Sequence, residues 1–325
     1  MKDFHSEKNE KSKITFRLDK ILSSAAIGSR KEVKKLLRED RVSWQDETLR
    51  DASRKFSLAQ IEDLRFDGYP IEPIFTPVLM FNKGPDVLTA MEDRRQLTIA
   101  DFLPFEWLNR DLAPIGRLDK DTSGLLLLTS DGQLNHRVAS PKHEVEKEYL
   151  FIYEGAPLGQ KEIEAVSAGL RLGDGTKCAP AKLLLPMPAQ GAEEQVLDPT
   201  TTTSSGNLGH LFDPDAPTSA GNLGHLFDPD ARPLPERFQG LWLESPATPT
   251  TSNGPWLARL ILREGFFHQV KRMIERLGRE VILLHRDRVG SLWLDPNLQE
   301  NELRLLTEEE RIPLYQEVEL DLPPR

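Results

Sequence analysis

The sequence has little of several features that define common classes of protein. Its 325 residues include a single cysteine, Cys178, so no disulfide can form within the chain, as suits a reducing cytosol. The longest apolar runs are far too short to span a bilayer. The first 13 residues lack the apolar core of a secretory signal. These absences predict a cytoplasmic protein with no membrane partner.

Spacing typical of metal ligands is also missing. Zinc sites combine cysteine and histidine at short, regular intervals. The seven histidines of this chain stand at no such interval from one another or from the cysteine, so we expect no metal site.

Positive charge is scarce overall, since the formal net charge is −10 at pH 7. Phosphate contacts depend on local charge, however, and the charge is unevenly spread. Residues 1–60 carry a balance of +5, with 15 Lys and Arg against 10 Asp and Glu. Residues 186–255 hold 9 acidic and 2 basic residues, which is nearly half of the deficit in the rest of the chain. The N-terminal part can therefore still meet an anionic partner.

Two helices are predicted within residues 15–62. Apolar residues recur at helical spacing from Leu18 to Ala25, and Ser29 and Glu32 have the spacing of a capping box that opens a second helix. In the second helix apolar and basic residues fall on opposite sides, although a solvated charged face is the alternative. The basic residues expected to contact an anionic partner are Arg17, Arg30, Lys31, Lys34, Lys35, Arg38 and Arg41.

The rest of the chain divides by composition. Residues 1–14 are predicted to be a polar, disordered tail, and residues 63–76, with their prolines, a linker. Residues 77–325 combine predicted strands with predicted helices. Residues 186–255 interrupt this domain with 11 of the 24 prolines and several Thr/Ser runs, which predicts a flexible insertion.

The insertion contains an internal repeat. The 11 residues GNLGHLFDPDA occur at 206–216 and again at 221–231. Two copies are too few for a solenoid, which needs at least three to bury a core. The alternative is a short docking motif built on Phe212 and Phe227, which stand in identical acidic settings.

Two carboxylates precede an apolar segment in the stretch GRLDKDTSGLLLLT. Asp119 and Asp121 stand two residues apart, just before a glycine and four leucines. A polar turn that leads into a buried strand explains this stretch on local grounds. A glycoside hydrolase with two catalytic carboxylates is a further alternative, although that chemistry needs them on opposite sides of a sugar.

Several stretches in a fixed order resemble known families. Residues 17–49 are similar to the S4 RNA-binding domain, which docks a two-helix basic face on structured RNA. GRLDKDTSGLLLLT resembles the catalytic motif of the pseudouridine synthases that modify ribosomal RNA, and the order of motifs is most similar to the synthase A branch for small-subunit RNA. The other stretches that carry the resemblance are FNKG (81–84), SPKHEVEKEYL (140–150), GLRLGDGTKCAPAKL (169–183), REGFFHQVKRM (263–273) and LHRDRVGSLWLD (284–295).

The resemblance implies an α+β fold in two parts. A small S4-like RNA-binding domain at 15–62 precedes a catalytic domain at 77–325, which is built on a mixed, mostly antiparallel sheet with flanking helices. The implied reaction isomerises a specific uridine to pseudouridine, since uracil leaves its ribose at N1, turns and rejoins through C5. It implies no cofactor. The implied partner is ribosomal RNA or an assembling ribosomal subunit, and we expect the enzyme to be a monomer.

The resemblance also implies roles for individual residues. Asp119 matches the catalytic carboxylate, which acts as a nucleophile or takes a proton. Tyr149 matches a tyrosine that stacks on the uracil, although a tyrosine in a strand often serves the core. Lys271 matches a basic residue that pairs with the aspartate and keeps it ionised. Arg117 would fill the gap left by an extruded uridine, and further RNA contacts are expected from His268, Gln269 and Arg272.

The sequence departs from the family pattern in one motif and leaves two rival functions open. Relatives have Asn-Lys-Pro-x-Gly where this chain reads NKGPD, at residues 82–86. A non-catalytic RNA-binding protein of ribosome assembly is one rival, but it predicts the absence of Asp119, Tyr149 or Lys271, and all three are present. A synthase that acts on large-subunit ribosomal RNA is the other.

Overall fold

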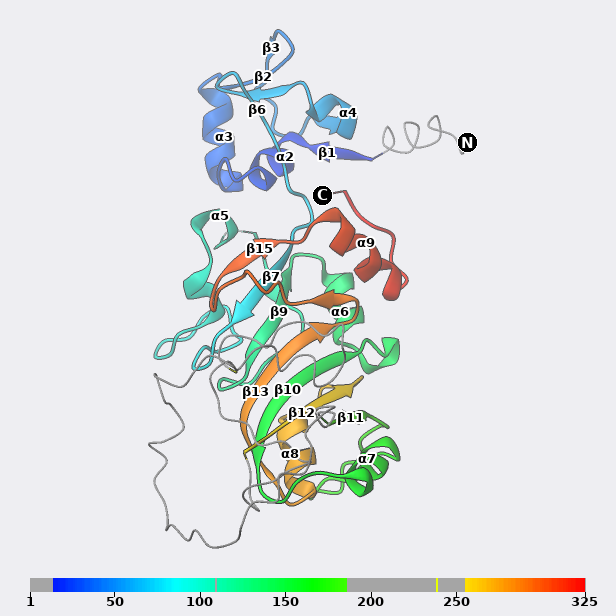
Figure 1. Cartoon of the computed structure of the whole chain (residues 1–325). Coiled ribbons are helices and arrows are strands. Elements are labelled where there is room, and N and C mark those ends of the chain that lie inside the picture. The colour runs from blue at the N-terminus through cyan, green and yellow to red at the C-terminus, as the bar shows by residue number, and fades with distance from the viewer. Residues whose placement is uncertain (1–13, 109, 186–237, 239–254, 325) are drawn as a thin grey trace, which may run out of the picture.

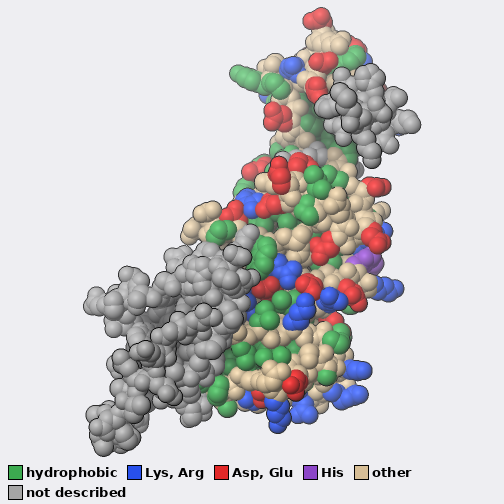
Figure 2. Space-filling view, turned by 45° about the vertical axis from the view of Figure 1, so that its right-hand side comes forward, with side chains coloured by type: hydrophobic (Ala, Val, Ile, Leu, Met, Phe, Trp, Pro, Cys, Tyr) green, Lys and Arg blue, Asp and Glu red, His purple; other side chains and the backbone are tan. Residues whose placement is uncertain are grey.

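The structure consists of two units of unequal size joined by a narrow neck (Figure 1). It is a computed structural model that describes residues 14–108, 110–185, 238 and 255–324. The smaller unit is N-terminal, and the larger one contains a long, curved sheet. On the face shown in Figure 2, basic and acidic side chains are interspersed over the larger unit.

The N-terminal unit contains two small sheets and three short helices. Strand β1 pairs with β4, and the second sheet has the order β3-β2-β5-β6, with antiparallel neighbours throughout. Its core includes Leu18, Leu22, Val33 and Leu37, which are all buried. The elements are β1 (Thr15–Arg17), α2 (Leu18–Ser24), α3 (Arg30–Arg38), β2 (Val42–Trp44), β3 (Glu47–Thr48), β4 (Lys55–Ser57), α4 (Leu58–Ile61), β5 (Leu64–Phe66) and β6 (Tyr69–Pro70).

Helix α3 confirms the predicted capping box. The Ser29 hydroxyl accepts a hydrogen bond from the Glu32 amide, and the Glu32 carboxylate accepts one from the Ser29 amide at 2.8 Å. Two amides that the first turn leaves without helical partners are thereby satisfied. Arg30 is the first residue of α3, but its side chain lies outside the described part of the structure. The other basic side chains of α3 are exposed, namely Lys31, Lys34, Lys35 and Arg38.

The predicted linker at 63–76 is wrong over most of its length. Strand β5 pairs with both β2 and β6, so it is part of the N-terminal sheet. Ile71 and Phe75 complete the core of that unit and are 5% and 6% exposed. The prolines misled the prediction, because a strand at the edge of a sheet, such as β6, tolerates Pro70. The N-terminal unit therefore extends to Phe75 and does not end at residue 62.

The larger unit is built on a nine-stranded sheet. Its main path has the order β11-β12-β10-β13-β9-β7-β15, with β14 paired to β13 and β8 paired to β9. Among the strand pairs that the structure describes, only β9 and β13 run parallel, which confirms a mixed, mostly antiparallel sheet. The strands are β7 (Val78–Lys83), β8 (Ala113–Pro114), β9 (Ser123–Thr129), β10 (Lys147–Glu154), β11 (Lys182–Leu184), β12 (Trp256–Leu262), β13 (Glu280–Val289), β14 (Leu292–Trp293) and β15 (Leu303–Leu305).

Helices cover both faces of this sheet. On one face Leu126 of β9 lies in a core with Met273 of the helix α8, and on the other face Leu125 lies in a core with Leu134 and Leu314. Burial on both faces explains the run of leucines in β9. The helices are η1 (Ile99–Phe102), α5 (Phe105–Leu108), α6 (Gly132–Ala139), η2 (Pro141–His143), α7 (Gln160–Ser167), α8 (Gln269–Arg276) and α9 (Glu308–Glu317). None of the described helices is long and apolar enough to cross a membrane.

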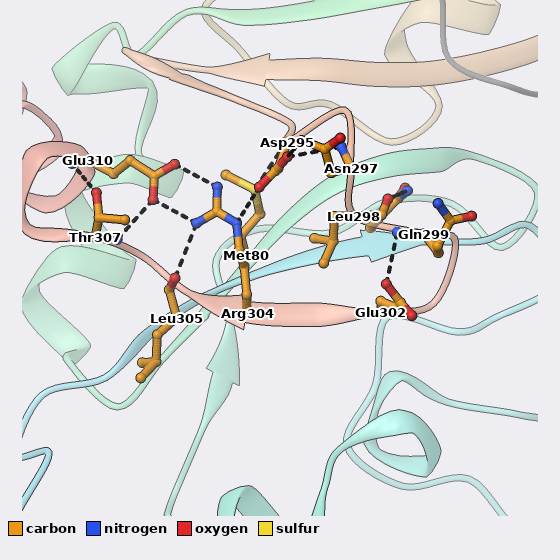
Figure 3. Close-up of polar contacts among 11 residues, drawn as sticks. Met80, Asp295, Asn297, Leu298, Gln299, Glu302, Arg304, Leu305, Thr307 and Glu310 are labelled. Atoms are coloured by element: carbon orange, nitrogen blue, oxygen red, sulfur yellow. Dashed lines mark hydrogen bonds and ion pairs between the residues drawn. The ribbon is translucent and has the colours of Figure 1, made fainter.

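An arginine ties the edge of the sheet to the C-terminal helix (Figure 3). Arg304 of β15 donates through Nε to Asp295 at 2.7 Å and through Nη1 and Nη2 to Glu310 at 2.8 and 2.7 Å. The hydrogen-bonded Glu310 carboxylate, together with Asp295, raises the pKa of Arg304 above its ordinary value. Glu310 also accepts the amide of Thr307, the N-cap of α9, at 2.9 Å. The start of α9 is thereby fixed against the strand that closes the sheet.

One residue of the predicted insertion belongs to the core. Phe238 is fully buried and packs against Leu150 and Ile152 of β10 and Leu257 of β12. The prediction of a flexible insertion at 186–255 is therefore wrong at this position, because apolar side chains on this face of the sheet need a cover. The predicted tail up to residue 13 and the rest of the insertion, at 186–237 and 239–254 with both copies of the repeat, lie outside the described residues.

Candidate active site

A cavity of about 520 Å³ opens where the loop before β9 meets the start of α8. Asp119 and Arg117 of that loop, Tyr149 of β10, and His268 and Gln269 at the start of α8 all line it. The sheet brings these segments together, because β9 and β10 are both neighbours of β13. The structure therefore places the predicted catalytic carboxylate and tyrosine in one pocket with three of the predicted RNA contacts.

A buried lysine holds the loop that carries Asp119. Lys83, the last residue of β7, is fully buried, and its ammonium donates to the carbonyls of Gly84, Asp119, Lys120 and Thr122 at 2.8–3.1 Å. Such charge-assisted bonds fix the backbone of the loop. Sequence reasoning assigned Lys83 no role, because nothing in the stretch FNKG shows that its lysine is buried.

Thr89 secures the same loop one residue before Asp119. Its hydroxyl donates to the Leu118 carbonyl at 2.7 Å and accepts from the Leu118 amide at 3.2 Å. The Thr122 amide donates to the Asp119 carbonyl at 3.1 Å, which closes a turn. The stretch is thus the polar turn that its composition suggested, and the same turn presents Asp119 to the pocket.

The glycine that follows this turn is required by the close approach of two strands. β9 and β13 pair in parallel at Gly124 and Arg286. Gly124 has a φ of +105°, and a Cβ at this position would collide with the carbonyl oxygen of Arg286. Glycine alone combines that backbone conformation with the absence of a Cβ. The approach brings the Asp119 loop and the side chain of Arg286 to the same cavity.

His268 is the basic side chain that contacts the Asp119 carboxylate among the described residues. Its Nε2 lies 3.4 Å from Oδ1 of Asp119, and the two side chains are 40% and 27% exposed. His268 has a left-handed backbone with φ +50°, and its ring stacks on Phe267 at 3.7 Å between centroids. Strained residues of this kind cluster at functional sites. The sequence predicted an RNA contact for His268 but gave no sign of its pairing with Asp119.

The predicted ion pair between Lys271 and Asp119 is wrong. The ammonium of Lys271 binds both carboxylate oxygens of Asp121 at 2.6 Å. Partial burial raises the pKa of Asp121, but the bond to Lys271 outweighs it, and the pKa lies below its ordinary value. His268 and Lys271 are three residues apart at the start of α8, so they reach the two carboxylates side by side. Asp121 is thus neutralised by a lysine, whereas Asp119 faces the pocket.

Two buried cations in the pocket escaped sequence reasoning. Lys147 and Arg286 line the cavity and are 8% and 3% exposed. Arg286 donates through Nε to the Leu125 carbonyl at 2.8 Å, and Lys147 donates to the Val145 carbonyl at 3.1 Å. Burial, with the nearby charge of Arg286, lowers the pKa of Lys147 to about 8. No sequence signal marked them, because Lys and Arg are seldom fully buried.

Gln269 and Arg272 brace the loop that carries His268. The side-chain amide of Gln269 donates to Glu264 at 2.9 Å, and Gln269 is 5% exposed. Arg272 donates to the Phe267 carbonyl at 3.2 Å. The described contacts of both residues are therefore internal, and direct RNA contacts by them stay a prediction.

The basic residues of the N-terminal unit divide into two groups. Arg17 lies 2.8 Å from Asp19, and Arg41 donates to Asp67 at 2.9 Å, so carboxylates already engage both arginines. Lys35 has a weaker partner in an exposed glutamate 3.8 Å away. Of the predicted contact residues on α3, Lys31, Lys34 and Arg38 are exposed and make no ion pair with any described residue.

The pocket offers acid–base and electrostatic chemistry. Asp119 supplies a carboxylate, Tyr149 an aromatic ring, and His268, Lys147 and Arg286 a set of groups that favour an anionic ligand. Within the described ranges, no three His, Cys, Asp or Glu side chains lie together so that they could hold a metal ion.

Comparisons with known proteins agree with these features. The family model described as RNA pseudouridylate synthase matches residues 77–276. An uncharacterised RNA pseudouridine synthase of Bacillus subtilis (strain 168), YtzG, is 31% identical over 294 residues, which cover 90% of this chain and 96% of that protein. The ribosomal small subunit pseudouridine synthase A of Yersinia pestis is 31% identical over 296 residues, with the same coverage of both chains. A crystal structure of a pseudouridylate synthase is 28% identical and covers 92% of this chain and 99% of its own, with a TM-score of 0.49.

The matched region spans most of the pocket. It includes the Asp119 loop, β10 with Tyr149 and the whole of α8, and it ends before Arg286 on β13. It covers more than half of the chain, and the relatives extend the similarity over nine-tenths of it. The chain therefore belongs to the RNA pseudouridylate synthase family.

Proposed function

We propose that this protein isomerises a specific uridine of small-subunit ribosomal RNA to pseudouridine. The observation that carries the proposal is the pocket shared by Asp119 and Tyr149 in a member of this family. The substrate class rests on relatives from Yersinia pestis and Escherichia coli (strain K12), which are named for the small ribosomal subunit and are 31% and 29% identical to this chain. The substrate also implies a cytoplasmic enzyme, and we expect it to act as a monomer.

Asp119 acts on the uridine that enters the pocket. Its carboxylate attacks the sugar or the base, or takes a proton, while the bond from N1 to C1′ breaks and the bond from C5 to C1′ forms. C5 then loses its proton and N1 gains one, so the product is an isomer of the substrate. The hydrogen bonds that Lys83 and Thr89 make to the loop hold the carboxylate in place. Little reorganisation is then needed when the substrate binds, which favours the transition state.

Tyr149 and Lys271 support this reaction in different ways. Tyr149 is 8% exposed in the pocket wall, where its ring is available to stack on uracil. Lys271 acts through Asp121, because their ion pair fixes the far end of the catalytic loop to α8. We therefore propose a positioning role for Lys271 in place of direct contact with Asp119. Arg117 is exposed at the cavity, where it can enter the space left by an extruded uridine.

The N-terminal unit is proposed to be an S4-like domain that binds the RNA next to the modified uridine. Its exposed cations Lys31, Lys34 and Arg38 share helix α3 and have no described carboxylate partner. Such a face contacts phosphates and recognises RNA by shape. A second binding surface of this kind selects among uridines that the pocket alone cannot distinguish.

The proposal is tested by mapping pseudouridines in the ribosomal RNA of cells with and without the gene. One modified position in small-subunit RNA is expected to disappear with the gene and to return with the wild-type copy. A missing position in large-subunit RNA would support the alternative substrate, and an unchanged map would support the non-catalytic alternative.

The catalytic residue is tested by Asp119→Asn, with Asp121→Asn as the matched control on the same loop. Asp119→Asn is expected to slow pseudouridine formation at least about a hundredfold, because the amide neither attacks nor accepts a proton. RNA affinity and unfolding temperature should stay near wild type. Asp121→Asn removes only the ion pair that positions the loop and should slow the reaction far less than Asp119→Asn does. Equal rates for wild type and Asp119→Asn would remove Asp119 from the reaction.

A further inference from the structure

Lys147 and Arg286 lie in the pocket without a carboxylate partner. Neither makes an ion pair with any residue that the structure describes. Arg286 uses Nε for the Leu125 carbonyl, while its Nη2 is buried and has no hydrogen-bond partner among the described residues. Lys147 uses one of its three donors for the Val145 carbonyl. Both side chains therefore have donors to spare inside a cavity that they line.

The carboxylates closest to Lys147 in the chain are engaged elsewhere. Glu146 pairs with Arg288 at 3.1 Å, and Glu148 pairs with Arg259 at 2.8 Å. Glu317 of α9 acts on Lys147 electrostatically, but it accepts the Ser291 amide at 2.9 Å and makes no described ion pair. The two cations are thus buried beside each other with little compensation.

An uncompensated pair of buried cations costs free energy in the unbound protein. Removing a charge from water is unfavourable unless a partner of opposite sign restores the interactions that water made. Proteins keep such strain mainly at functional sites, where a ligand relieves it. The two cations therefore point to an anion that enters the cavity from outside.

We propose that Lys147 and Arg286 form a subsite for a phosphodiester group that flanks the extruded uridine. This inference rests on the proposed function, since the ligand is the RNA substrate itself. A phosphodiester carries a full negative charge and two free oxygens, one for the guanidinium of Arg286 and one for the ammonium of Lys147. The uracil carbonyls are neutral and would leave the charge of both cations unbalanced. Cavities of this volume commonly hold ligands of the size of a nucleotide.

The subsite is tested by a double-mutant cycle between the protein and the RNA. The full-length protein is bound to an RNA stem-loop that carries the mapped uridine, with either natural phosphates or an uncharged methylphosphonate next to the uridine on the 5′ or the 3′ side. The natural and the methylphosphonate RNA carry the same 2′-O-methyl groups, so that they differ only at the replaced phosphate. For wild type, the methylphosphonate at one side is expected to weaken binding about 10- to 100-fold.

On the natural RNA, Arg286→Gln is expected to weaken binding by the same factor as the methylphosphonate does for wild type. On the methylphosphonate RNA the variant should bind almost as well as wild type, because both changes remove the same interaction. Lys147→Met repeats the cycle independently if Arg286→Gln does not fold. Lys161→Gln, a change of an exposed lysine on α7 outside the cavity, should show the full methylphosphonate effect.

Additive effects in both cycles would overturn the subsite. A fall in kcat with no change in phosphate dependence would also overturn it, because the cations would then act on the uracil. A failure of the proposed function is distinguishable from a failure of the subsite. In that case the wild-type enzyme would modify no small-subunit RNA, and the cycle could still be measured on the RNA that it does modify.

Discussion

Gly124 lies where β9, which follows the Asp119 loop, pairs with β13, which carries Arg286. Replacing Gly124 by alanine is expected to lower the free energy of unfolding by at least about 2 kcal/mol, because the new Cβ meets the Arg286 carbonyl and the backbone has a positive φ. Chemical denaturation measures the change. Gly173→Ala is the control, since no heavy atom lies within 4 Å of its added Cβ. Equal stability of the two variants would mean that β9 and β13 can separate at little cost.

The lowered pKa of Lys147 predicts that the free energy of unfolding depends on pH through this one side chain. Its pKa is about 8 in the folded protein, where burial and Arg286 lower it and Glu317 raises it, and about 10.5 in the unfolded chain. Between these values the unfolded state binds more protons, so the contribution of Lys147 to stability rises with pH. Below pH 8 the charged form costs folding at most on the order of 3 kcal/mol.

The measurement is the difference in unfolding free energy between Lys147→Met and wild type. That difference should favour the variant at pH 7 and shrink as pH rises from about 8 to about 10. Affinity of the wild type for RNA should fall over the same rise, because deprotonated Lys147 no longer attracts a phosphate. A difference that does not change with pH would show that Lys147 stays charged or is solvated.

At the scale of helices and strands, the sequence predicted those elements whose signals are local. Helix α3 follows from its capping box and its apolar positions, and β9 follows from a run of leucines after a turn. The strands β5 and β6 were missed, because their residues belong to a strand pair only through β2, and the prolines concealed the pairing. Signals that depend on a partner elsewhere in the chain are invisible in one sequence.

The same limit explains what was found and missed in the pocket. Asp119 and Tyr149 lie within recognisable motifs, and the structure places both in the pocket. The contact of His268 with Asp119 and the burial of Lys83 arise only when strands and loops far apart in sequence come together. Motifs thus identified reactive groups, whereas the groups that position them required the fold.

Phe238 divides the predicted insertion into a residue that stabilises the fold and a segment that we expect to contribute little to stability. Phe238→Ala is expected to lower the free energy of unfolding by about 3–5 kcal/mol, because it empties a site between β10 and β12. Replacing residues 189–230 by a short Gly/Ser linker should change stability by about 1 kcal/mol or less, since loop-closure entropy depends weakly on length. Thermal unfolding of both variants makes the comparison. The division fails if shortening the segment destabilises the protein as much as Phe238→Ala does.

For the whole molecule, the salt dependence of RNA binding reports on the N-terminal unit. Replacing Lys31, Lys34 and Arg38 by glutamine should reduce the slope of log affinity against log salt by roughly 0.7–0.9 for each phosphate that the variant no longer neutralises. Titrations at several salt concentrations give the slope, with Lys161→Gln as a control that leaves it unchanged. A slope equal to that of wild type would show that α3 carries a solvated face that does not touch RNA.

Removal of the whole unit must respect its observed boundary. A deletion of residues 1–62 would leave β5 and β6 without β2 and would expose the core side chains Leu64 and Ile71. We expect that protein to aggregate. A deletion that ends at Phe75 keeps Thr76, whose hydroxyl donates to the Pro324 carbonyl in the larger unit at 3.0 Å. That second protein is the one suited to binding experiments.

The parallel pairing of β9 with β13 also governs how the protein is made. The pocket draws on residues from Leu88 to Val289, so it cannot assemble until β13 has left the ribosome. At about 5–20 residues per second, β9 waits on the order of ten seconds after its own synthesis for this partner. Throughout that time the part of the β9 edge that β8 does not cover is open to other chains. Slow translation between β9 and β13 is therefore expected to increase the fraction of chains that aggregate. A chain that stops before β13 should have no partial activity.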